Sequence, residues 1–106
     1  MKAIAILTSP TGDRFFEAYG PMSKNTSMAT VFNSKEIAER AAGTRFGRTC
    51  DAVWNSERDQ QAYALKNYNG WTVTVLELSE GESYENRDGI ARLTPAGAQR
   101  YAVLAN

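Results

Sequence analysis

Apolar residues in this chain come in short runs, and this limits the possible folds more than any other feature of the sequence. The longest run, Ala3–Leu7, has the length of a β-strand, far below the ~20 residues that a membrane-spanning helix needs. It is also too short for the apolar core of a secretory signal. The chain has 106 residues, close to the usual size of one domain. We therefore expect residues 1–106 to form a single soluble domain that stays in the cytoplasm.

Three segments before the first expected helix have strand character. Lys2–Thr8 reads as a buried strand, and Arg14–Tyr19 as its hairpin partner. Between them, Ser9–Gly12 has proline and glycine at the positions that favour a type I turn. After a polar loop, Met28–Phe32 is expected to be a third strand.

A helix is expected to follow these strands. Asn33 with Glu36 three residues later forms a variant of the capping box, and the helix is expected to run to about Phe46. Its apolar stripe consists of small residues in the main, which allows close packing on a sheet; the stripe is Ile37, Ala38, Ala41 and Ala42.

Residues 56–68 admit two interpretations. They are rich in helix formers, so Asn69-Gly70 can be the C-terminal cap of a helix. The same dipeptide can instead be a type I′ turn that joins two strands. Helix propensity over residues 57–66 favours the first interpretation. Trp71–Leu78 alternates apolar and polar residues and is the clearest strand of the chain.

The last part of the chain predicts a loop, a strand and a helix. Ser79–Gly89 is expected to be a long acidic loop, Ile90–Leu93 a short strand, and Thr94-Pro95 the cap and first position of the final helix. The run Leu93–Gly97 resembles the junction after the wing of winged-helix regulators. The acidic loop in the wing position departs from that family, so we interpret the likeness as a shared way to cap a helix.

Together these elements predict an α+β fold. We expect a mostly antiparallel sheet of four or five strands, with two or three helices packed on one face.

Residue types that are missing restrict the chemistry of the chain. It has no histidine, the commonest general base near neutral pH. Cys50 is the only cysteine, so neither an intrachain disulfide nor a usual zinc site can form. We expect no enzymatic activity, no metal and no cofactor. An enzyme or ligand-binding domain that uses carboxylates or Cys50 is kept as an alternative.

Charge is balanced overall but unevenly placed. Twelve basic and twelve acidic residues give a net charge of zero, which argues against a general coat for nucleic acid or membranes. Residues 1–48 hold seven basic and four acidic residues, and residues 49–106 hold five and eight. Two candidate binding surfaces follow: a basic segment of Arg40, Arg45, Phe46 and Arg48, and an acidic loop of Glu80, Glu82, Tyr84, Glu85 and Asp88.

These observations favour a small non-enzymatic binding protein, an inhibitor or adaptor that occupies the surface of a protein partner. Proteins of this kind are common in phages and other mobile elements. The alternative is a nucleic-acid-binding domain that uses the basic segment and exposed aromatic residues. Exposed strand edges also favour a homodimer.

Overall fold

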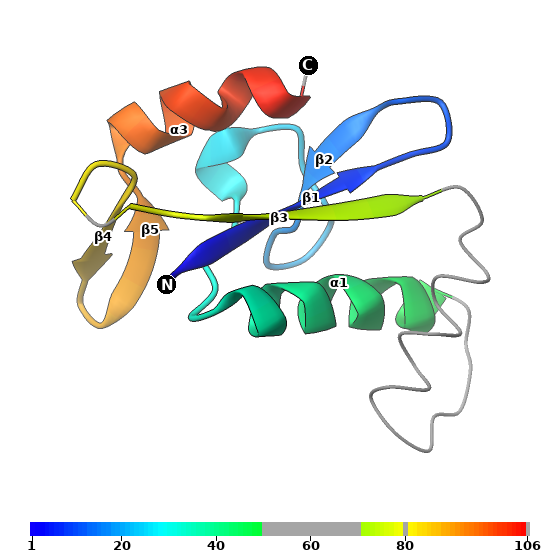
Figure 1. Cartoon of the computed structure of the whole chain (residues 1–106), viewed down its shortest axis with the longest axis horizontal. Coiled ribbons are helices and arrows are strands. Elements are labelled where there is room, and N and C mark those ends of the chain that lie inside the picture. The colour runs from blue at the N-terminus through cyan, green and yellow to red at the C-terminus, as the bar shows by residue number, and fades with distance from the viewer. Residues whose placement is uncertain (50–70, 80, 106) are drawn as a thin grey trace.

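The computed structural model describes residues 1–49, 71–79 and 81–105 of the chain. Its elements form an α+β arrangement with two antiparallel sheets (Figure 1). In chain order they are β1 (Ala3–Thr8), β2 (Arg14–Phe16), the 3-10 helix η1 (Thr26–Met28), α1 (Lys35–Thr49), β3 (Thr72–Glu77), β4 (Tyr84–Arg87), β5 (Ile90–Leu93), α3 (Pro95–Ala102) and the 3-10 helix η2 (Val103–Ala105).

The larger sheet has the strand order β2-β1-β3, so the most apolar strand lies in the centre. The β1–β2 hairpin turns at the expected position, where the Gly12 amide donates to the Ser9 carbonyl at 2.9 Å. β1 pairs along its whole length with β3, in a register that sets Ile6 opposite Thr74. The strands expected at Lys2–Thr8 and Trp71–Leu78 are therefore present, and they are neighbours.

Helices cover both faces of this sheet, so the expectation of helices on one face is wrong. Because side chains alternate along a strand, Ala3 and Ala5 of β1 face α1, where they pack with Ala38. Ile4 and Ile6 point to the opposite face and join the main core, which Tyr101 and Leu104 at the C-terminal end of the chain complete. Figure 1 shows α1 on one side of the sheet and α3 on the other.

The third strand expected at Met28–Phe32 is not a strand. Met28 ends the 3-10 helix η1, and the rest of the segment makes only isolated bridges, Ala18 with Ala29 and Ala3 with Phe32. The cause is the short length of β2, which covers only one end of the β1 edge. At the rest of that edge, single residues supply the hydrogen bonds to β1: the Glu17 amide donates to the Ala5 carbonyl, and the Phe32 amide donates to the Ala3 carbonyl.

Helix α1 begins at Lys35, one residue later than an N-cap at Asn33 would place it. The Ile37 amide donates to Ser34 Oγ at 3.2 Å, so Ser34 and not Asn33 caps the helix. The Asn33 side chain instead accepts a hydrogen bond from the Lys2 ammonium. Ala38 and Ala42 of the small-residue stripe are fully buried, as expected, but Ile37 is 41% exposed.

The acidic loop expected at Ser79–Gly89 contains a strand. β4 pairs with β5 and forms a two-stranded sheet, with Arg87 opposite Ile90. Asp88 and Gly89 between them both have positive φ, 55° and 79°, which is the backbone of a type I′ turn. The Asp88-Gly89 dipeptide is itself a typical sequence signal for such a turn.

The C-terminal helix begins as predicted. Thr94 is its N-cap, with Oγ1 accepting from the Gly97 amide at 2.9 Å, and Pro95 is its first residue. The interpretation of residues 56–68 and of Asn69-Gly70 lies outside the described residues. No helix in the described part of the chain is both long and apolar enough to span a bilayer.

Candidate functional site

A groove of about 750 Å³ runs between helix α1 and the segments that follow β2. One wall is a flank of α1. The other wall is the loop that begins at Glu17, together with Thr30 and Phe32 of the segment that leads into α1. The lining residues are Glu17, Ala18, Tyr19, Gly20, Thr30, Phe32, Ile37, Arg40, Ala41, Thr44 and Arg45. The groove thus gathers residues from three separate parts of the chain.

The two walls are joined by an ion pair between Glu17 and Arg45. Arg45 Nε donates to Glu17 Oε2 at 2.6 Å and Arg45 Nη2 donates to Oε1 at 2.7 Å. Both side chains are largely shielded, with exposed fractions of 7% for Glu17 and 18% for Arg45. Such a bidentate contact constrains the relative orientation of the two side chains and also pairs their charges. It therefore fixes the distance between α1 and the loop.

Arg45 also fixes the backbone of the loop itself. Its Nη2 donates to the Ala18 carbonyl at 2.9 Å and to the Gly20 carbonyl. Gly20 has a φ of 101°, a conformation that side chains other than glycine rarely adopt. The loop therefore turns sharply after Tyr19 and leaves that ring 97% exposed at the rim of the groove.

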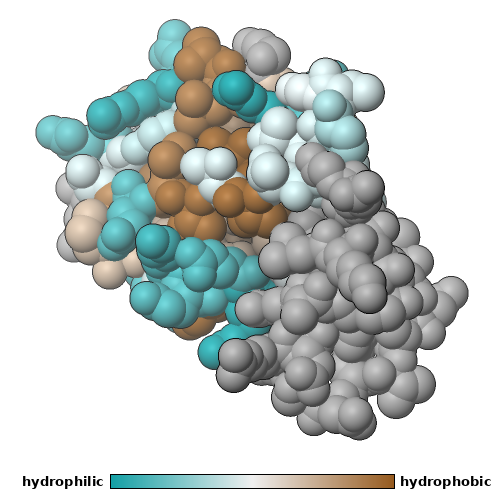
Figure 2. All heavy atoms as spheres, turned by 45° about the vertical axis from the view of Figure 1, so that its right-hand side comes forward, coloured by the Kyte–Doolittle hydropathy of each residue, from teal (hydrophilic) through white to brown (hydrophobic). Residues whose placement is uncertain are grey.

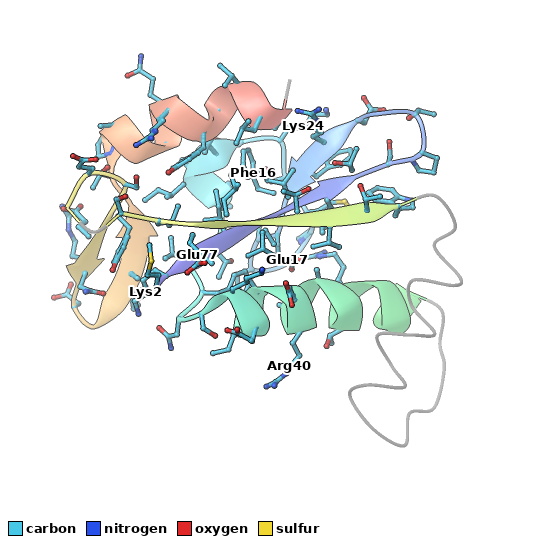
Figure 3. All side chains as sticks on the ribbon, in the orientation of Figure 1. Lys2, Phe16, Glu17, Lys24, Arg40 and Glu77 are labelled. Carbon is cyan, nitrogen blue, oxygen red and sulfur yellow. The ribbon has the colours of Figure 1, made fainter. Side chains whose placement is uncertain are left out.

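The surface of the groove is mixed in character. Tyr19 and Ile37, which is 41% exposed, contribute apolar surface from opposite walls. Arg40 adds a cation to the same flank of α1. Figure 3 shows Glu17 between the sheet and α1, and Arg40 directed outward from the helix.

The basic segment is only partly placed at this site. Arg40 and Arg45 both line the groove, but the guanidinium of Arg45 is engaged by Glu17 and by the loop. Phe46 and Arg48 fall within α1, and their side chains lie outside the described residues, as does Cys50.

The acidic residues lie on the β4–β5 hairpin, away from the groove. Glu82, Glu85 and Asp88 are exposed. Tyr84 is only 7% exposed and belongs to the main core, which corrects the expectation that its ring lies in an exposed loop. Glu80 lies outside the described residues.

Cations accompany these carboxylates. Glu85 stands opposite Arg92 in the hairpin register and pairs with Arg87 at 3.3 Å. In the described part of the chain, no three or more acidic or cysteine side chains gather as metal ligands. The hairpin surface is thus of mixed sign.

Comparison with protein-family models, with curated proteins and with solved structures finds no match for this chain.

The residues that define the groove differ from the expected ones. Glu17 and Tyr19 were not singled out in the sequence, and Ile37 was expected only in the apolar stripe that packs on the sheet. An aromatic residue directly before Gly20-Pro21 is one usable signal, because turn residues end a strand and leave the preceding side chain at the surface. The burial of Glu17 has no such signal, since its partner lies 28 positions away.

Proposed function

We propose that this protein is a small non-enzymatic binding protein that acts by occupying the surface of a protein partner through the groove beside α1. The observation that carries the proposal is the exposure of Tyr19 and Ile37, at 97% and 41%, on the two walls of a groove whose shape is fixed from within. Burial of these two side chains against a partner would remove apolar surface from water, the main favourable term in association.

The residue types at the rim support a protein partner. Tyrosine and arginine are enriched among the residues that dominate binding energy at protein interfaces, and both occur here as Tyr19 and Arg40. The fixed loop adds to this, because a surface that is already ordered loses little conformational entropy when it binds.

The state of Glu17 favours binding over acid/base chemistry at this groove. Both carboxylate oxygens accept hydrogen bonds from Arg45, so the carboxylate holds the loop in place. Its Arg45 partner is equally occupied, because the guanidinium also donates to the carbonyl oxygens of Ala18 and Gly20.

The proposal is tested by capture of partners from the native host with three immobilised proteins. They are the wild type, the Tyr19→Ala/Ile37→Ser double variant, and an Ile90→Ser control. Ile90 is 54% exposed but lies on β5, in the other sheet. Quantitative mass spectrometry then compares each captured protein across the three samples.

We expect at least one protein to be captured by the wild type and by the Ile90→Ser control and to be lost with the double variant. Equal capture of every protein by all three samples would overturn the proposal. Loss with Ile90→Ser alone would move the binding surface to the hairpin.

A further inference from the structure

We propose that the outer edge of β3 is a self-association surface, on which a second copy of this chain adds its own β3 in antiparallel orientation. The inference goes beyond the proposed function, because it concerns a different surface. In a dimer of this kind the two three-stranded sheets become one continuous sheet.

The hydrogen-bonding phase of β3 identifies which backbone groups the edge offers. The Leu78 amide donates to the Lys2 carbonyl of the β1 side at 2.8 Å. In an antiparallel pair, successive residues direct their backbone N–H and C=O groups alternately toward one neighbouring strand and away from it. Thr72, Thr74 and Leu76 therefore also direct these groups toward β1. Val73, Val75 and Glu77 then direct theirs to the outer edge, where no strand of the described residues pairs with them.

This edge lacks the features that usually prevent pairing. Edge strands are commonly protected by lysine, proline, bulges or very short length. β3 is six residues long, contains neither proline nor lysine, and has one charge, Glu77, at its end. Its apolar side chains are only half-buried. Figure 2, in which the side of the molecule that holds the start of β3 comes forward, shows a band of hydrophobic surface between hydrophilic side chains.

A two-fold axis at Val75 pairs all three outward-facing residues of β3 within the strand and keeps their charges apart. A two-fold axis at Val75 sets Val75 opposite its own copy and sets Val73 opposite Glu77 of the second copy. Each of these pairs exchanges two N–H···O bonds, and no like charges meet. An axis at Glu77 would instead bring two carboxylates together, which is unfavourable across strands.

Helix α1 fits the same axis. It packs on both β1 and β3, and Ala38 shares a cluster with Val75, so the axis passes beside the Ala38 turn. With strands about 4.8 Å apart, the two α1 axes would lie roughly 10 Å apart, a normal distance for packed helices. The two helices of the dimer therefore lie side by side and antiparallel.

The flank of α1 that would meet its copy carries complementary charges. Helical spacing places Lys35 and Glu39 on the side opposite the groove residues Ile37, Ala41 and Thr44. Both Lys35 and Glu39 are exposed. In the antiparallel arrangement the two Glu39 side chains approach each other at the two-fold axis, and Lys35 of each copy lies beside Glu39 of the other, so each carboxylate has a cation of the partner copy next to it. This complementarity is why we assign the edge to a second copy and not to an unrelated strand.

Sedimentation equilibrium of the full chain tests the proposal. We expect the wild type to reach twice its 11.7 kDa mass with a concentration dependence that defines a dissociation constant. Val75→Pro removes an amide that faces only the outer edge, so it should abolish the dimer. Val75→Ala keeps that amide and should remain dimeric. Circular dichroism confirms that each variant is folded.

A charge exchange on α1 gives a second, surface-only test. Glu39→Lys brings like charges together and should raise the dimer dissociation constant about tenfold. The Lys35→Glu/Glu39→Lys double variant restores both pairs and should return the constant to near its original value. A wild type that stays monomeric at about 300 µM, a folded Val75→Pro that still dimerises, or a double variant no better than Glu39→Lys would overturn the proposal. Capture of a foreign strand at this edge by a monomeric wild type would do the same.

Discussion

Arg45 near the end of α1 reaches across to Glu17 and grips both of its carboxylate oxygens, at 2.6 and 2.7 Å. The contact joins helix α1 to the short segment that follows β2, and the two residues lie 28 positions apart in the sequence. Because Arg45 also binds the loop carbonyls of Ala18 and Gly20, one side chain sets both the width of the groove and the position of Tyr19.

Removal of Arg45 should cost far more stability than an ordinary surface substitution. Arg45→Ala leaves the Glu17 carboxylate, in a residue only 5% exposed, without its partner. Breaking a buried ion pair from one side costs about 3–5 kcal/mol; the partial exposure of Arg45 places the expected loss at the lower end. Urea unfolding, followed by circular dichroism, measures the change in the free energy of unfolding.

Two further variants separate the charge from its geometry. Arg45→Lys keeps the charge but lacks the planar fork, and we expect an intermediate loss. Glu17→Gln/Arg45→Met removes both charges and should lose less than Arg45→Ala, because no charge remains buried alone. Equal stability of Arg45→Ala and wild type would show that the pair does not hold the loop.

Gly97→Ala in α3 should be destabilising, although alanine is the better helix former. A Cβ at this position would lie 2.9 Å from the Ser83 carbonyl carbon and Cα, and closer still to the carbonyl oxygen. The expected loss is about 2 kcal/mol, typical of overpacking, against a gain of about 1 kcal/mol from helix propensity alone. A melting temperature above that of the wild type would contradict the close approach of α3 to Ser83.

The β4–β5 turn should depend on the residue at Asp88. Its φ of 55° is tolerated by aspartate and asparagine but not by a β-branched residue. We expect Asp88→Val to lose about 1–2 kcal/mol and Asp88→Asn to lose almost nothing, as measured by thermal unfolding. Equal effects of the two substitutions would argue against the type I′ turn.

Local patterns in the sequence predicted the elements that depend on local physics. The apolar alternation of Trp71–Leu78 predicted β3, and Thr94 with Pro95 predicted the start of α3 to the residue. Ala38 and Ala42 of the expected apolar stripe lie on the buried face of α1, whereas Ile37 and Ala41 of the same stripe line the groove. The α+β class with antiparallel pairing followed from the same patterns.

Features that depend on distant partners were not predicted. The sequence cannot show that Glu17 meets Arg45, so Arg45 was expected to be available for binding. Tyr84 was expected in a loop because acidic neighbours surround it, yet its ring joins the core through β4. The helices lie on both faces because β1 is apolar on both, a property of Ala3–Leu7 that the expectation of a one-sided sheet overlooked.

The nucleic-acid alternative has its own expected outcome. Arg45 is occupied by Glu17, and the net charge of the chain is zero. We therefore expect no retention of the protein on mixed DNA or RNA at about 50 mM salt, where phosphate contacts are strong. Retention that falls steeply with added salt, and that Arg40→Gln reduces, would favour the alternative over a protein partner.

Site-specific photo-crosslinking tests the central claim, that the groove beside α1 binds a protein partner, most directly. A photoreactive phenylalanine derivative replaces Tyr19, which is 97% exposed at the groove, or Ile90, which is 54% exposed on β5. After irradiation in extract of the native host, we expect a discrete protein adduct from position 19 and none from position 90. An adduct from position 90 with none from position 19 would contradict the account and place the binding surface on the hairpin.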